Sequence, residues 1–406
     1  MSWNNRTCLS LDPLRCLTVS LGWLLLLGIG TLSAHEQGEA SAPELISISP
    51  TTRPFQDRTQ ALRQVMGEML ELEVLYHNSD TTKDEVELKE RWYKKRDEVY
   101  TAYQAMLQTC LAEFLEAPNE RQPLADYLYG QLKASVKRGE GQGWLPIAQA
   151  LLDQRYPADD IISLYVQCCV TNNRFDLARA PYAKLVEDGQ ASAELVKLYQ
   201  ELQSMELAWQ RELEAQSKDT SGPPLPQARI HTTKGSFVIE LFENQAPEAV
   251  ANFVQLAEKG FYKSHDFFMV IDNQLAQTGC PKSDGTGGPG YFIPEEEKSL
   301  EPRGLFSGYV GLALLKDLPD SGGSQFYINF LPQMMLGPEQ GASRVFGRVI
   351  SGMHNVCRLT RIDPKAKKDE SQPPPVADEI LSIEIIGKRD HAYEPTRLSQ
   401  PMVNPN

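Results

Sequence analysis

Residues 228–242 read "ARIHTTKGSFVIELF", and this stretch decides the fold of the carboxyl-terminal part of the chain. Apolar and polar side chains alternate on both sides of "TTKG", which has the composition of a tight turn. A period of two residues puts every second side chain on the same face of a sheet. The stretch therefore predicts a β-hairpin with one buried face.

The residues after the hairpin extend this domain. "APEAVANFVQLAEKG" (residues 246–260) predicts a short helix that ends at Gly260, a residue type common at helix C-caps. Further strand-like segments, glycine-rich loops and a second short helix near "SGMHNVCRL" (residues 351–359) follow. The segment "EEEKSLEP" (residues 295–302) is expected to be a solvated loop. The whole is a mixed but mainly β domain.

The amino-terminal part has a helical pattern instead. Apolar residues recur at helical spacing in two segments, first at Leu62, Val65, Met66, Met69, Leu72 and Tyr76, then at Val99, Tyr103, Met106, Leu107, Cys110 and Phe114. "HNSDTTKDE" (residues 77–85) between them supplies turn and cap residues, which predicts an antiparallel helix pair. More helices are expected from Pro123 to about Gln216.

A weak internal similarity occurs within those later helices. "LYGQLKASVKRGEG" begins at Leu128 and "LYVQCCVTNNRFDLARAPYAKLVEDG" begins at Leu164, 36 residues later. Helix pairs at about 34-residue spacing, with Ala178 where two helices would cross, resemble tetratricopeptide repeats. The alternative is a generic bundle of helical hairpins. A solenoid would offer a concave surface to a protein partner, whereas a bundle need not.

Composition places the domain boundaries. "QSKDTSGPPLPQ" collects Ser, Gly and Pro, and its paired prolines cannot continue a helix. We predict an α+β multidomain chain with these parts: a signal peptide or signal anchor (1–34), a polar spacer (35–54), an all-α helical-hairpin domain (55–216), a linker (217–227), a mainly β domain (228–387) and a disordered tail (388–406).

The amino terminus predicts export. Arg6 and Arg15 precede an uncharged run from Cys16 to Ala34, and acidic residues follow it. The run is long for the apolar part of a signal peptide, about 7–15 residues, and short for a membrane span, about 20 residues. Residues 1–34 are therefore either a cleaved signal peptide or a retained anchor. We expect an extracytoplasmic protein, periplasmic or secreted, held at the membrane by residues 16–34 if they are retained.

Charge and cysteine usage narrow the classes of function. The net charge of −14 argues against sequence-independent nucleic-acid binding, which needs basic patches. Five cysteines lie beyond the leader, and their spacing is not that of a zinc site: Cys110, Cys168, Cys169, Cys280 and Cys357. One disulfide among them remains an alternative in an exported protein. Cys168 and Cys169 fall in an apolar helical pattern and are expected in the core. No metal or cofactor is predicted. "DGTGGPG" lacks the "GK[ST]" ending of a phosphate loop.

Several motifs in order resemble those of cyclophilins, which are β-barrel peptidyl-prolyl cis-trans isomerases. They are "TTKGSFVIELFENQAPEAVANFVQLAEKGFY", "FFMVI", "LAQTGCPKSDGTGGPGY", "GSQFYINF" and "RVFGRVISGM". The resemblance runs from about residue 228 to 387 and leaves the helical half uncovered. It implies a closed β-barrel with two short helices and binding of proline-containing polypeptides.

The reaction itself sets simple requirements. The X–Pro bond rotates over a barrier of about 18–20 kcal/mol because its C–N bond has partial double-bond character. A catalyst needs an apolar pocket for the proline ring and a donor aimed at the twisted amide, and it must bind that geometry most tightly. The resemblance assigns Gln277 to catalysis and the following residues to substrate binding: Phe268, Leu275, Ala313, Gln325, Tyr327, Met335 and Leu336.

Two departures from the family pattern bear on activity. Family members read Phe-His-Arg-Val-Ile where this chain reads "FFMVI", so Met269 occupies the position of the catalytic arginine and has no N–H to donate. Met335 replaces an expected tryptophan. The sequence therefore predicts an exported isomerase weakened at Met269. The alternative is a non-catalytic proline-peptide-binding or scaffold module, with a helical domain that binds a partner protein in either case.

Overall fold

The structure is a computed structural model of the 406-residue chain. It describes residues 53–399 apart from 79–81, 191–192, 298–299, 316–317, 333–344 and 366–374. The predicted leader lies outside the described residues. The chain divides into two compact units, residues 1–130 and 131–406. The domain boundaries predicted from composition stay predictions.

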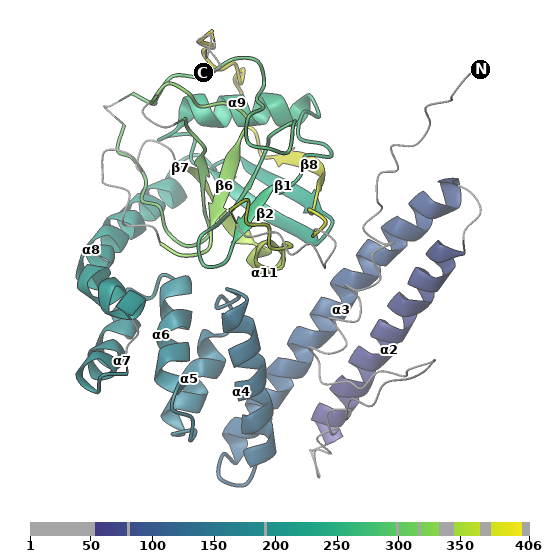
Figure 1. Ribbon diagram of the computed structural model, residues 1–406, viewed down its shortest axis with the longest axis vertical. Helices are drawn as coiled ribbons and strands as arrows, with labels where there is room; N and C mark the ends of the chain where they lie inside the picture. Colours follow the sequence, from purple (N-terminus) through teal and green to yellow (C-terminus); the bar gives the residue numbers. More distant parts are fainter. Residues whose placement is uncertain are drawn as a thin grey trace. The chain divides into compact units, whose positions relative to one another are not determined.

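The first unit is built on a helical hairpin. Helices α2 (Arg53–His77) and α3 (Thr82–Glu116) lie side by side (Figure 1). The short connection between them makes the pair antiparallel, as the sequence predicts. The apolar positions of the two predicted stripes are buried except Val65, which is half-buried; Leu62, Met66, Val99 and Met106 are among the buried ones. Helix α4 (Gln122–Lys137) begins in this unit.

The second unit opens with helices that pack in succession. They are α5 (Leu145–Asp153), α6 (Ile161–Thr171), α7 (Phe175–Glu187) and α8 (Ala193–Ser221), and each contacts the next along the chain (Figure 1). Ala178 on α7 is fully buried, as are Cys168 and Cys169 on α6. Small side chains at these positions let the helices approach closely.

An eight-stranded antiparallel sheet forms the rest of the second unit. Its strands are β1 (Gln227–Thr232), β2 (Gly235–Leu241), β3 (Met269–Ile271), β4 (Leu275–Thr278), β5 (Tyr309–Leu312), β6 (Phe326–Asn329), β7 (Val345–Ser351) and β8 (Ile380–Ile386). Their spatial order is β3-β4-β6-β5-β7-β2-β1-β8. The sheet is curled and places the candidate site on the β3-β4-β6 side.

The β1–β2 hairpin follows the alternation in the sequence. Its register pairs Ala228 with Ile239 and Ile230 with Phe237, all of them buried. Thr232 stabilises the turn because its hydroxyl donates to the Gly235 carbonyl at 2.7 Å. Gly235 has φ of +132°, and a Cβ there would lie 2.4 Å from the Asn355 side chain. The turn therefore requires glycine at this position.

Two helices pack on the sheet. Helix α9 (Pro247–Glu258) buries an apolar face, and its Phe253 packs against Phe326 and Phe346 at centroid distances of 5.5 Å. Gly260 ends it with φ of +68°, and its N–H donates to the Ala257 carbonyl at 2.9 Å, as expected of a C-cap glycine. The second short helix, α11 (Met353–Cys357), packs on β2.

The family resemblance predicts a closed barrel, whereas the strands form a curled half-barrel. Among the described residues no ladder joins the edge strands β3 and β8. The two edges meet near the start of these strands, where Asp266 forms an isolated bridge with Glu379. Next to it, the Phe267 N–H donates to the Asp378 carbonyl at 2.8 Å. Beyond this point the outer edge of β3 pairs with a different segment, at Ile362.

The segments at the two ends of the β domain differ from the linker and the disordered tail predicted from composition. Helix α8 continues to Ser221, into the segment predicted to be a linker. At the other end, the described residues 388–399 pack on the domain instead of being disordered: Tyr393 is buried in the core and Leu398 forms a bridge with Phe292. In the described part of the chain, no helix is long and apolar enough to cross a membrane.

A buried ionic cluster lies between α8 and the β domain. Arg303 bonds both carboxylate oxygens of Glu212 and donates to Asp219 at 2.6 Å. Its guanidinium also lies over the ring of Phe242, 3.9 Å from the centroid. Tyr309 on β5 donates to Glu212 at 2.6 Å. Helix α8 and the sheet therefore share a polar core.

Candidate functional site

The candidate site is a lateral row of side chains on strands β3, β4 and β6. The register pairs Met269 with Gln277, and Gln277 with Tyr327. Residues directly opposite one another on adjacent strands point to the same face. Their neighbours Val270 and Ala276 are buried in the core on the other face. The row therefore lies on the face of the sheet turned away from the core.

Apolar side chains border the row. Leu275 lies two residues before Gln277 on the same face of β4 and is half-buried. Phe268 is 9% exposed, and its ring lies against the glycine-rich loop: a methyl group added at Gly285 would sit 3.4 Å from it. Gly285 has φ of +82°, so the loop both turns and leaves room for the ring at this point. These residues form an apolar border to the row.

A chain of amide hydrogen bonds fixes the polar part of the site. The Gln277 side chain donates through Nε2 to Gln325 Oε1 at 3.0 Å. Gln325 Nε2 in turn donates to the carbonyls of Gly285 and Gly287, each at 2.8 Å. The backbone of Gln325 accepts the N–H of Ala313 at 3.0 Å. Gln277 also carries a second amide hydrogen and a carbonyl oxygen.

Tyr327 is positioned by a glycine on the neighbouring strand. Gly311 on β5 pairs with Tyr327, and a Cβ at Gly311 would lie 2.6 Å from the tyrosine hydroxyl. The ring therefore covers the backbone of Gly311. Tyr327 is 6% exposed, so it forms a floor to the site and not a projection into solvent.

Met269 sits half-buried at the edge of the row. Its thioether can contact an apolar group but cannot donate a hydrogen bond. Arg348, an arginine on β7, forms an ion pair with Glu240 at 2.8 Å. Met335 and Leu336, the remaining predicted substrate-binding residues, lie outside the described residues.

Burial shifts the pKa of several cysteines and of one histidine in the described residues. All five cysteines beyond the leader are free, buried thiols. Burial raises the pKa of Cys110 and of Cys357 to about 12, and that of Cys169 to about 11. Burial also lowers the pKa of His265. No group of three potential metal-ligating side chains comes together within the residues that the structure describes.

Sequence reasoning missed the part played by backbone atoms of the glycine-rich loop. The carbonyls of Gly285 and Gly287 hold Gln325, and the Gly287 N–H donates to the Cys280 sulfur at 3.2 Å. "DGTGGPG" was the signal, since a glycine-rich segment beside a predicted site permits close backbone approach. The sequence could not say which side chain the loop would meet.

Comparison with known proteins finds similarity to one family. The family model described as "Cyclophilin type peptidyl-prolyl cis-trans isomerase/CLD" matches residues 227–385. A peptidyl-prolyl cis-trans isomerase of Synechococcus elongatus is 35% identical over 162 residues, which are 40% of this chain and 97% of that protein. One of Helicobacter pylori is 42% identical over 124 residues, 30% of this chain and 72% of that protein.

Solved structures include a Cryptosporidium parvum cyclophilin type peptidyl-prolyl cis-trans isomerase in the presence of the dipeptide Ala-Pro. It is 29% identical and covers 39% of this chain and 98% of its own, with a TM-score of 0.32. From the sequence relatives, the chain belongs to the cyclophilin-type peptidyl-prolyl cis-trans isomerases. The matched family domain begins at residue 227, after the helices.

Proposed function

We propose that the chain binds proline-containing segments of exported proteins along the β3-β4-β6 row and isomerises X–Pro bonds slowly. The observation that supports this most directly is the row itself, with Gln277 held by Gln325 beside apolar Phe268 and Leu275. The row offers a fixed hydrogen-bonding amide and an apolar floor. Rotation about an X–Pro bond needs no nucleophile, metal or cofactor.

The rate is expected to be low because of Met269. In the twisted transition state the prolyl nitrogen accepts a hydrogen bond better than in either planar isomer, so a donor at this position would bind the transition state selectively. Removing one preorganised donor typically costs about 10²–10³ in rate, or roughly 3–4 kcal/mol. Apolar contacts and Gln277 still bind the peptide, so affinity is retained while turnover falls.

The second candidate function is a proline-peptide-binding module without turnover. Met269 favours it, since a binding site needs the pocket and the amide but not the donor. The two candidates share the site and differ only in whether the bound X–Pro bond rotates faster than in water. A measurement of rate together with affinity therefore separates them.

The test uses full-length protein and a short X–Pro peptide, with wild type beside Met269→Arg and the matched control Met269→Leu. We expect weak wild-type turnover, a gain of about 10²-fold in Met269→Arg, and no gain in Met269→Leu, with similar peptide affinity for all three. No wild-type turnover with retained affinity would establish the binding module. A wild-type rate that Met269→Arg does not raise would show that another group stabilises the twisted amide.

The cellular setting belongs to the same proposal. Residues 1–34 would direct export, either as a cleaved signal peptide or as an anchor through residues 16–34. The helices before the β domain, in a tetratricopeptide-like or a simpler hairpin arrangement, would bind a partner protein. Mass spectrometry of the mature amino terminus tests the leader: a chain that starts near residue 35 supports cleavage, and an intact chain in the membrane fraction supports the anchor.

A further inference from the structure

Strand β3 carries Met269 at the edge of the sheet, and a segment after α11 flanks it. Ile362 forms a backbone bridge with Val270: the Val270 N–H donates to the Ile362 carbonyl at 2.8 Å, and the Ile362 N–H donates back at 3.0 Å. An edge strand of three residues forms few backbone hydrogen bonds. The two bonds to Ile362 therefore contribute strongly to fixing the position of β3.

Arg361, the neighbour of Ile362, joins this segment to three other parts of the unit. Its Nε donates to Asp272, the residue directly after β3, at 2.6 Å. One terminal nitrogen donates to the carbonyls of Cys357 and Leu359, at 2.7 and 2.8 Å. The other donates to the carbonyl of Arg138, just after helix α4. The planar guanidinium satisfies these directions at once, which a lysine cannot do.

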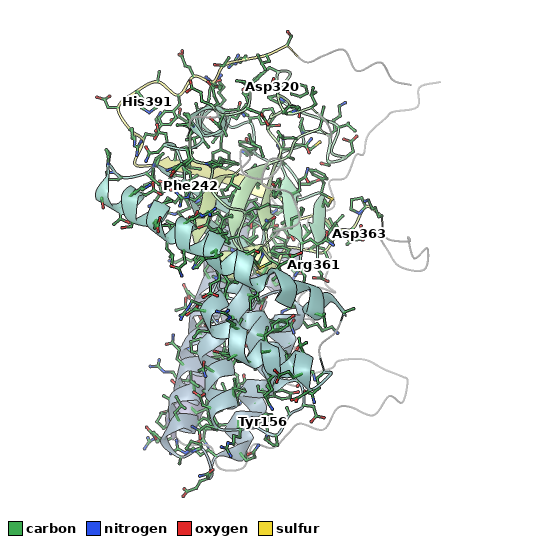
Figure 2. The ribbon with its side chains drawn as sticks, turned by 90° about the vertical axis from the view of Figure 1, so that its left-hand side faces the viewer. Tyr156, Phe242, Asp320, Arg361, Asp363 and His391 are labelled. Carbon is green, nitrogen blue, oxygen red and sulfur yellow. The ribbon has the colours of Figure 1, made fainter. Side chains whose placement is uncertain are left out.

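The turn after α4 is itself anchored to the same segment. Cys357 donates through its sulfur to the Gly139 carbonyl at 3.3 Å, and Arg358 forms an ion pair with buried Glu140 at 3.0 Å. Burial raises the pKa of Glu140, but Arg358 and Arg138 outweigh it and leave that pKa lowered, so the carboxylate is ionised. The turn after α4 thus holds the Arg138 carbonyl, the acceptor of Arg361, in a fixed place. Figure 2 shows Arg361 on the side of the sheet where the helices meet it.

We propose that Arg361 is a positioning residue through which the turn 138–140 after helix α4 holds strand β3, and with it the β3-β4-β6 row, in place. The inference rests on the proposed use of that row to bind proline-containing peptides. It gives the helical segment of this unit a direct part in the isomerase site: the helices support the strand that carries Met269 and pairs with Gln277. A displaced β3 would misalign both side chains against a bound peptide.

The test uses the full-length protein with Arg361→Lys, which keeps the charge but loses the planar bridge, and Asp272→Ala, which removes only the bond to β3. Asp272 is 58% exposed, so its variant should fold normally. Arg389→Lys is the matched control, because its guanidinium bonds the carbonyls of Pro223 and Pro224. The readouts are affinity for an X–Pro peptide, hydrogen exchange of the Val270 amide and the global unfolding midpoint.

We expect Arg361→Lys to weaken peptide affinity about tenfold and to speed exchange of the Val270 amide about tenfold, at an unchanged unfolding midpoint. Asp272→Ala should give a smaller change of the same kind, and Arg389→Lys none. Unchanged exchange at Val270, or faster exchange without a loss of affinity, would overturn the inference. If the wild type bound no peptide, the proposed function would fail by itself, and Val270 exchange would still decide whether Arg361 holds β3.

Discussion

Replacement of Arg303 should destabilise the second unit severely. The Arg303 side chain is 2% exposed, and it forms ion pairs with two carboxylates, Glu212 and Asp219, that are 2% and 6% exposed. The Arg303→Met variant keeps an apolar stem over Phe242 but leaves both carboxylates buried without their cation. Removing one partner of a buried ion pair costs about 3–5 kcal/mol, because the remaining charge is neither hydrated nor paired. We expect a loss in this range in the free energy of unfolding.

Urea denaturation followed by circular dichroism measures the loss, and two further variants interpret it. Arg229→Met, which breaks an exposed pair with Glu384, should cost below about 1 kcal/mol. The triple variant Arg303→Met, Glu212→Gln, Asp219→Asn removes every charge and should recover most of the stability, since the penalty is one of unpaired charge. A loss below about 1 kcal/mol for Arg303→Met would refute the reasoning, because the two carboxylates would then have access to water.

Two further predictions follow from buried polar groups. A fragment of residues 222–406 lacks helix α8 and both acidic partners of Arg303, so it should melt at least about 10 °C below the full-length protein in a thermal scan, and an equal midpoint would contradict this. The pKa of Glu296, which accepts the Ala249 N–H at the start of α9, is raised to about 7 by burial. A raised pKa in the folded state means that this group's contribution to stability is complete below about pH 4.5 and is lost as the pH rises through 7. The urea midpoints at pH 5 and pH 8 should therefore differ less in Glu296→Gln than in wild type. Equal differences in the two proteins would contradict a raised pKa at Glu296.

Comparison of individual motifs with the structure shows which features could be predicted from the local sequence. The hairpin at 228–242 was predictable because alternation and a turn act between near neighbours in the chain. That the Met269 side chain has no N–H to donate was equally readable, since it depends only on which atoms the side chain carries. By contrast, the segment 295–302 was expected to be a solvated loop, whereas Glu296 caps helix α9 through the Glu248 and Ala249 N–H groups. The composition of this segment is typical of an exposed loop, and it does not show that the Glu296 carboxylate accepts these two N–H groups.

The sequence by itself determined the β1–β2 hairpin, helix α9 and the family, because those follow from side-chain chemistry and local periodicity. Only the tertiary structure decided what supports the site. Gln277 meets Gln325 across 48 residues, and Arg361 meets the Arg138 carbonyl across 223. Such contacts depend on how the chain turns between the partners. The local sequence around a polar residue is the same whether its side chain lies in solvent or forms a buried hydrogen bond.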